Sequence, residues 1–199
     1  MTEQEKMRRG MLCDANNDPE LLRLRERAKD LCFEFNRLRP SDTQMQEAVL
    51  HRLLGKTGES FRILAPFWCD YGSNIEIGEN FFANHNTVIL DGAKVTFGSN
   101  VFLAPNCGFY TAGHPIDAAR RNQGLEYAYP ITVGDNVWFG AGVQVLPGVR
   151  IGAGSVIGAG SVVTHDIPEN CVAAGNPCRV LRAITEADKK ASWDRSFSV

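Results

Sequence analysis

A six-residue period runs through the second half of the chain and restricts its fold more than any other feature. From Val133 the units read VGDNVW, FGAGVQ, VLPGVR, IGAGSV, IGAGSV and VTHDIP. The first position of each unit is apolar, the second is usually Gly, and the fifth is Val, Ser or Ile. Neither a helix nor an ordinary strand repeats every six residues, whereas the stacked coils of a parallel β-helix do. The period therefore predicts an all-β coil whose first positions form continuous core ladders.

The same period appears upstream, where the first positions are again apolar: Tyr71, Ile77, Ala83 and Ile89. A second run follows after a two-residue slip: Phe97, Leu103 and Phe109. The segment 113–130 (GHPIDAARRNQGLEYAYP) has no such pattern. We expect it to be a loop that leaves the coil and returns in register, and long loops of this kind are usually functional.

Ahead of the coil the sequence predicts two amphipathic helices. Residues 18–20 (DPE) supply an N-cap, a first-turn proline and a first-turn acid, and apolar residues then recur at helical spacing as far as Leu38. A second helix is expected to begin at Ser41, with Gln44 completing a capping box, and to stop at Gly55. We interpret the arginines of the first helix as a solvated face: Arg23, Arg25 and Arg27.

Composition narrows the class of protein. The 21 basic and 23 acidic side chains leave a formal net charge of -2, which provides no electrostatic footprint for nucleic acid or an anionic membrane. The six cysteines are scattered without CxxC spacing, and the N-terminus has no apolar stretch that could act as a signal. We therefore expect reduced thiols in a cytoplasmic protein.

Several longer motifs accompany the helical leader: CDYGSNIEIG, FFANHN, YTAGHPID, PITVGDNVWFG, the IGAGSV units, VVTHDIP and AAGNPCRV. Through them nearly the whole chain resembles the galactoside and maltose O-acetyltransferase family of the left-handed β-helix superfamily. This resemblance implies a left-handed parallel β-helix that forms a homotrimer, with each active site in a cleft between two subunits. The expected organisation is a helical segment 1–58, a coil domain 59–183 with the loop 113–130, and a C-terminal tail 184–199. The hand comes from the resemblance, because periodicity does not distinguish it.

The resemblance also implies an acetyl-CoA-dependent O-acetyltransferase that acts on a sugar hydroxyl of a maltose-, glucose- or galactoside-like acceptor. Such a reaction needs a base to remove the hydroxyl proton, and histidine titrates near neutral pH. Of the four histidines, His51, His85, His114 and His165, the one in the AGHP motif matches the family's catalytic residue. His114 is therefore the expected general base.

Further site residues follow from the same resemblance. The expected acceptor-binding residues are Asp14, Asp70, Asn84 and Asp91, whose carboxylates and amide can hydrogen-bond sugar hydroxyls. Asn84 is also expected to donate to the oxygen that becomes negative during acyl transfer. The expected acetyl-CoA-binding residues are Asn84, Ala141, Ala159, Thr164, His165, Arg179 and Arg182. No metal is expected, and the recurring GAG corners are interpreted as structural. His165 stands where relatives often carry Lys, and Asp70 replaces a Ser of the galactoside branch.

Three alternatives remain open. A γ-type carbonic anhydrase shares the coil but needs three histidine ligands for zinc, and only His85 and His114 lie in plausible places. A non-catalytic scaffold would be compatible with the repeat alone, although the His114 loop and the arginines of AAGNPCRVLR argue against it. An acetyltransferase could also take an amine, serine or antibiotic as acceptor, and only the resemblance of the two-helix leader favours the sugar branch.

Overall fold

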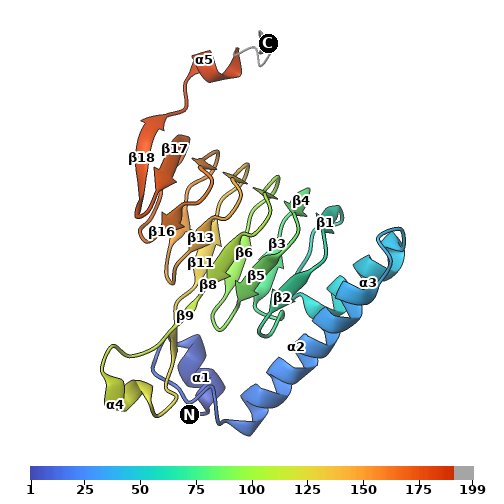
Figure 1. Ribbon diagram of the computed structural model, residues 1–199, viewed down its shortest axis with the longest axis vertical. Helices are drawn as coiled ribbons and strands as arrows, with labels where there is room; N and C mark the ends of the chain where they lie inside the picture. The colour runs from blue at the N-terminus through green and yellow to red at the C-terminus, as the bar shows by residue number, and fades with distance from the viewer. Residues whose placement is uncertain (191–199) are drawn as a thin grey trace, which may run out of the picture.

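The computed structural model describes residues 1–190 and shows a triangular parallel β-helix with two long helices against its first coil (Figure 1). In every coil the chain passes through three faces in turn. Face 1 contains β1 (Phe61–Ile63), β4 (Phe81–Ala83), β7 (Phe102–Leu103), β12 (Trp138–Phe139), β15 (Val156–Ile157) and β17 (Cys171–Gly175). Face 2 contains β2 (Phe67–Cys69), β5 (Thr87–Leu90), β8 (Gly108–Tyr110), β13 (Gln144–Val145) and β16 (Val162–Val163). Face 3 contains β3 (Ile75–Ile77), β6 (Val95–Phe97), β11 (Ile131–Val133) and β14 (Arg150–Ile151).

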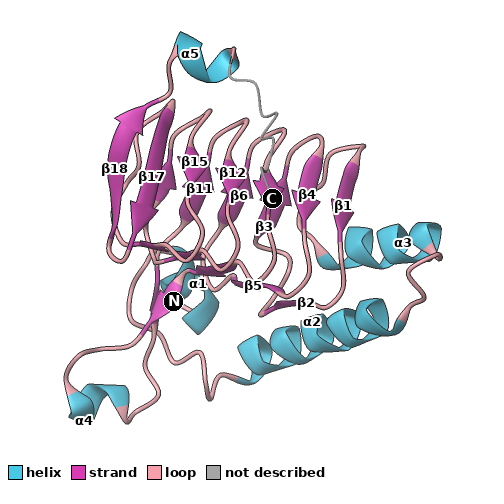
Figure 2. Ribbon diagram, turned by 45° about the horizontal axis from the view of Figure 1, so that its top comes forward, coloured by secondary structure: helices cyan, strands magenta, loops and turns pink. Residues whose placement is uncertain are grey.

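The C-terminal end and the loop extend beyond the regular coils. The last coil ends in β18 (Cys178–Ala183), which pairs antiparallel with β17, and α5 (Glu186–Lys189) follows it (Figure 2). The loop begins with β9 (Ala112–Gly113), contains α4 (Ala118–Arg121) and returns through β10 (Tyr127–Ala128), which pairs antiparallel with β9. The segment expected to be a loop thus closes on its own two-stranded base. Of the expected tail 184–199, residues 191–199 lie outside the described part of the chain.

The coil interior is a continuous apolar column, as the period predicts. Inward positions alternate with outward ones on each short strand, and the inward residues are almost fully buried. Four aromatic rings stack along the column, with Phe97 and Phe109 at 4.9 Å and Phe109 and Phe139 at 5.3 Å between centroids, both edge to face. Phe81 continues the stack at 5.0 Å from Phe97. Such pairs add to the free energy gained by burying the rings.

The strand register explains the two-residue slip in the sequence. Neighbouring strands of face 2 pair 20 residues apart in the first coils, as in Phe67 with Thr87, and 18 apart in later ones, as in Gln144 with Val162. The two extra residues lie between faces 2 and 3, at a position we call corner 2–3. One prediction is wrong here: Cys69 occupies the inward position assigned to Tyr71, whose side chain is instead buried in a separate small cluster under the leader.

Asparagine or glycine occupies the fourth position of the repeat units, where the backbone has a positive φ. Six asparagines have positive φ, Asn80, Asn86, Asn100, Asn106, Asn136 and Asn170, and the same conformation recurs in the later coils at Gly142, Gly148, Gly154 and Gly160. This left-handed region is accessible to Gly and tolerated by Asn. The asparagines also stack, since the Asn80 amide donates to Asn100 and the Asn100 amide donates to Asn136.

The leader contains one helix more than expected. α2 (Pro19–Arg37) is confirmed, with the Asp18 side chain accepting the Leu21 N–H. α3 (Thr43–Leu53) begins two residues later than expected and has no side-chain cap, so the capping box is wrong. α1 (Glu3–Arg8) was not foreseen, although Thr2 and Glu5 form a genuine capping box at its start. That pair of residues is a local sequence signal that would have predicted the helix.

Candidate active site

Corner 2–3 contains the longest connections between faces of the coil, and the loop 113–130, with β9 and α4, leaves from this same corner (Figure 1). A cavity of about 430 Å³ opens here, lined by Arg25, Asp70, Leu90, Tyr110, Ala112, His114 and Glu126. Two residues of the sequence-based site, Asp70 and His114, therefore share one cavity. Three charged or polar partners, Arg25, Tyr110 and Glu126, were not foreseen.

The hydrogen bond of His114 determines which ring nitrogen can act as a base. His114 Nδ1 lies 3.0 Å from the carbonyl oxygen of Leu125. A carbonyl oxygen only accepts, so Nδ1 carries the proton and the neutral ring keeps its lone pair on Nε2. The Nε2 atom lies 4.0 Å from Glu126 Oε1, and about half of the His114 side chain is exposed. The ring is thus oriented by backbone, with its basic nitrogen accessible and next to a carboxylate.

Asp70 and Arg25 form a second charged pair in the cavity. Arg25 Nε lies 4.0 Å from Asp70 Oδ1, and only 16% of the Arg25 side chain is exposed. Its Nη2 donates to Ala15 O and Tyr71 Oη, its Nη1 donates to Asn16 Oδ1, and the guanidinium lies over the Tyr71 ring. Arg25 is therefore not part of a solvated face, and that interpretation is wrong for this residue. Burial raises the pKa of Asp70, and the charge of Arg25 partly offsets the increase.

The buried Nε atom of Arg25 makes no hydrogen bond within the described residues. It lies beyond hydrogen-bonding distance of the Asp70 carboxylate, so both groups retain hydrogen-bonding capacity toward the cavity. An unpaired buried donor costs free energy unless a ligand or water satisfies it. This orphaned N–H and the Asp70 oxygens fit a hydroxyl-bearing ligand, because a hydroxyl can accept from the first and donate to the second.

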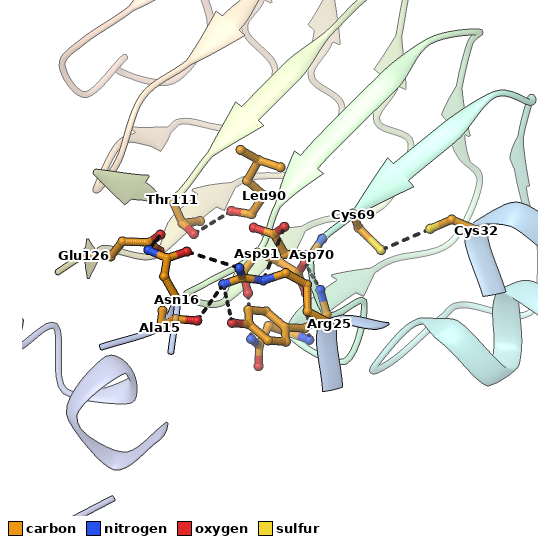
Figure 3. A network of polar contacts seen from close by, with 12 residues as sticks. Ala15, Asn16, Arg25, Cys32, Cys69, Asp70, Leu90, Asp91, Thr111 and Glu126 are labelled. Atoms are coloured by element: carbon orange, nitrogen blue, oxygen red, sulfur yellow. Dashed lines mark hydrogen bonds and ion pairs between the residues drawn. The ribbon is translucent and has the colours of Figure 1, made fainter. Parts of the chain in front are cut away.

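Asp91 lies beneath the cavity and is completely buried. Its Oδ1 accepts the N–H groups of Asp70 at 3.0 Å and Tyr71 at 2.8 Å, so it holds the segment that carries Asp70 (Figure 3). Asn74 donates through its backbone N–H to Asp91 Oδ2 and through its side chain to Asp91 O. Burial raises the Asp91 pKa to about 6 despite these bonds. In this chain Asp91 supports the site from below and does not line the cavity.

Cys13 and Asn16 of the N-terminal segment hydrogen-bond the base of the loop in the same chain. Cys13 and Glu126 exchange two backbone hydrogen bonds, and the Asn16 amide donates to both Gly124 O and Glu126 Oε1. Asp14 follows Cys13, but its carboxylate accepts from the backbone and side chain of Asn17 and does not line the cavity. The Glu126 carboxylate is held by Asn16 at 2.7 Å, which positions it near His114.

Asn84 and His85 occupy a different corner, between faces 1 and 2, which we call corner 1–2. Asn84 Oδ1 accepts the His85 N–H at 2.8 Å, and its side-chain amide donates to no described residue. His85 is exposed, and its Nδ1 bonds the Ala65 carbonyl oxygen. Within one chain Asn84 therefore does not join the His114 cavity, because the two corners lie at opposite edges of face 2.

The cofactor residues expected on later coils also divide between corners. Ala141 and Ala159 stack on corner 1–2, where Gly160 N donates to Ala141 O at 2.8 Å. A Cβ atom at Gly160 would meet no atom within 4 Å, so the part of this corner formed by Ala141, Ala159 and Gly160 is small and open. Thr164 and His165 lie on corner 2–3 and bond each other at 2.8 Å through Oγ1 and Nδ1.

The two arginines expected at the cofactor phosphates lie on β18 and are both exposed. Arg179 Nη1 donates to the neighbouring Cys178 O. Arg182 forms a two-pronged ion pair with Asp188 of α5, with both N···O distances 2.8 Å. The Arg182 guanidinium strongly lowers the pKa of Asp188. Arg179 thus has no carboxylate partner among the described residues, whereas Arg182 has one.

No group of three or more His, Cys, Asp or Glu side chains within residues 1–190 is arranged to hold a metal ion. Over the same residues, the helices are all too short or too polar to cross a membrane.

Comparison with known proteins gives concordant results. The profile described as the maltose acetyltransferase hexapeptide capping motif matches residues 6–58, and that of the bacterial transferase hexapeptide, six repeats, matches residues 130–165. A Saccharomyces cerevisiae protein provisionally named an acetyltransferase is 61% identical over 90% of this chain and 91% of its own length.

Two solved structures are similar over their full length. A maltose O-acetyltransferase from Clostridium difficile is 50% identical, with a TM-score of 0.91 over 94% of this chain and 99% of that one. A galactoside acetyltransferase in complex with coenzyme A is 43% identical, with a TM-score of 0.93 over 100% of this chain and 98% of that one. Sequence profile, sequence identity and fold agree over most of the length, and this chain belongs to the maltose and galactoside O-acetyltransferase family of hexapeptide-repeat acetyltransferases.

Proposed function

We propose that the protein transfers the acetyl group of acetyl-CoA to a hydroxyl of a sugar, with His114 as the general base. The main support for this proposal is the hydrogen bond from His114 Nδ1–H to Leu125 O, which leaves Nε2 as the basic atom. The cavity at His114 is also lined by Asp70, Arg25 and Glu126. A sugar hydroxyl that donates to Nε2 would lose its proton there as it attacks the acyl carbonyl. Glu126 would stabilise the imidazolium that forms.

The donor-binding residues fit an extended thioester. Acetyl-CoA would supply the activated acetyl group. Corner 1–2 suits its narrow arm, because Ala141 and Ala159 are small and Gly160 faces open space. Arg179 would bind a phosphate of the cofactor. Arg182 would also bind phosphate once its ion pair with Asp188 is broken. Thr164 and His165 would lie beside the narrow arm of acetyl-CoA. The coenzyme A bound to the similar galactoside acetyltransferase supports this choice of donor.

We infer that the complete site requires a second copy of the chain. His114 and Asp70 lie at corner 2–3, whereas Asn84, Ala141 and Ala159 lie at corner 1–2, across face 2. A neighbouring subunit could bring its corner 1–2 to the cavity, so that its Asn84 amide donates to the carbonyl oxygen as negative charge develops.

The outer surfaces of the coil support a trimer built on faces 1 and 2. Face 1 exposes Phe102 and Trp138 in neighbouring strands, and face 2 exposes Trp68. Face 3 presents polar outward residues instead: Glu76, Thr96, Thr132 and Arg150. Exposed aromatic side chains in a row mark interaction surfaces. If one face of each copy packs on a different face of the next copy, and each copy is rotated by one third of a circle relative to the last, three copies form a closed ring.

Comparing two histidine variants tests the catalytic assignment. His114→Ala should lower kcat with acetyl-CoA and a sugar acceptor about 100-fold to 10,000-fold, the usual loss for a general base. Its thermal unfolding should barely change, because the ring is half exposed and lies outside the core column. His85→Ala is the matched control. If it were the inactive variant, and His114→Ala stayed within a few-fold of wild type, the assignment would be wrong. A panel of sugars, amines and serine, with free thiol as readout, identifies the acceptor.

A further inference from the structure

Two cysteines from distant parts of the chain face each other where the leader meets the coil. Cys32 Sγ of α2 lies 3.7 Å from Cys69 Sγ of β2, and both side chains are buried (Figure 3). All six cysteines lie within the described residues, and no other two sulfurs come this close. Cys13 and Cys107 instead point at backbone carbonyl oxygens, and Cys171 at Ser155 and Pro168 O.

We propose that Cys32 and Cys69 are an oxidisable dithiol, which hydrogen peroxide closes to an intramolecular disulfide that ties α2 to β2 beside Asp70. A disulfide needs its sulfurs about 2.04 Å apart, so the present pair must approach by about 1.7 Å. A cavity of about 220 Å³ lies nearby between α2, α3 and the first coil, and neither cysteine lines it. Its lining includes Leu31, which precedes Cys32 in the chain, Ala28, which lies one helical turn before Cys32, and Tyr71.

The shared hydrogen bond differentiates the two sulfurs. It lowers the pKa of Cys32 and raises that of Cys69, which is also deeply buried. Both thiols are buried, so this hydrogen bond is what distinguishes them, and Cys32 is the better nucleophile because the thiolate is the reactive form. Its thiolate attacks one peroxide oxygen, the O–O bond breaks, and the departing hydroxide takes a proton to become water. The Cys69 sulfur then attacks the Cys32 sulfenic acid, and the Cys69 proton leaves with the hydroxyl as a second water. Two thiols are oxidised and one peroxide is reduced.

The position of the bond connects oxidation to the geometry of the cavity. Cys69 directly precedes Asp70, and Cys32 follows Arg25 on α2 by about two helical turns. A disulfide would therefore join the two elements that carry the Asp70–Arg25 pair. It would also close a long chain segment in the unfolded state and raise the Tm by about 10 °C. The formation of the bond does not depend on the reaction that the cavity catalyses.

The experiment uses the full chain, reduced and then freed of reductant. After exposure to hydrogen peroxide, thiols are counted in denaturant and peptides are mapped without reduction. We expect two of the six thiols to disappear, a peptide pair linked through Cys32 and Cys69, a loss of two hydrogens in mass, and a Tm increase that dithiothreitol reverses. Cys32→Ser and Cys69→Ser should each abolish the link. Cys107→Ser is the matched control, since this buried thiol has no sulfur neighbour, and it should keep the link.

Several results would overturn the proposal. These are oxidation of Cys32 without a link to Cys69, links between separate chains, or a link that survives in Cys32→Ser. Six intact thiols after prolonged exposure to hydrogen peroxide would count equally against it. The peptide map of the wild-type protein decides the question even if a serine variant fails to fold.

Discussion

The free energy of unfolding of Asp91→Asn minus that of wild type should increase as the pH rises. Burial raises the Asp91 pKa from an ordinary 3.8 to about 6. Between these values the folded state binds a proton that the unfolded state does not, so wild-type stability falls as pH rises through this window and levels off above it. The shift corresponds to about 3 kcal/mol of destabilisation at neutral pH.

About 2 kcal/mol of this penalty develops between pH 4.5 and pH 7.5. The asparagine variant carries no charge and keeps an Oδ1 that can accept the N–H groups of Asp70 and Tyr71. It loses the long bond from Asn74 N at 3.3 Å, a fixed cost of about 1 kcal/mol that does not change with pH. The free energy of unfolding of the variant minus that of wild type should therefore be about 2 kcal/mol larger at pH 7.5 than at pH 4.5.

Urea unfolding followed by circular dichroism at both pH values measures this difference, with protein concentration held constant because assembly shifts apparent stability. Thr111→Val is the matched control. Thr111 is equally buried at the same corner, and its hydroxyl donates to Leu90 O and accepts from Ala93 N, but it carries no charge. Its loss should cost about 1–3 kcal/mol at either pH. A pH-independent difference for Asp91→Asn, or one that favours wild type at pH 7.5, would refute the reasoning.

Two further predictions concern the assembly and the core. Trp138→Glu should give monomers in sedimentation and abolish turnover, because it places a charge on the aromatic part of face 1. The control Thr132→Glu, on polar face 3, should keep the trimer. An intact Trp138→Glu trimer would contradict the proposed assembly. Phe109→Ala should lower the free energy of unfolding by about 3–5 kcal/mol in a denaturation assay, since it leaves a cavity between Phe97 and Phe139. Phe33→Ala, on the exposed side of α2, should lower the free energy of unfolding far less in the same assay.

Much of the fold could be predicted because its signals are local. A first position that recurs every six residues must line the coil interior, and Phe109, Phe139 and Val145 do so. The N-cap at Asp18 likewise predicted α2. The candidate base was recognisable because His114 lies where the repeat pattern stops, and the structure places it at the edge of a cavity with Asp70. Its catalytic role remains a proposal.

The sequence by itself determined the coil period, its core ladders, the two long helices and the residue at which the loop departs. Each of these depends on neighbours a few positions away, so spacing alone encodes them. Only the tertiary structure decided which polar residues meet at corner 2–3. Arg25 has helical spacing typical of an exposed residue, yet α2 packs so that only 16% of its side chain is exposed, beside Asp70 and Tyr71. Asp91 reads as one more corner carboxylate, yet it is completely buried and accepts the N–H groups of Asp70 and Tyr71 from the preceding coil. Such contacts depend on the register of strands far apart in the chain, and no local pattern records that register.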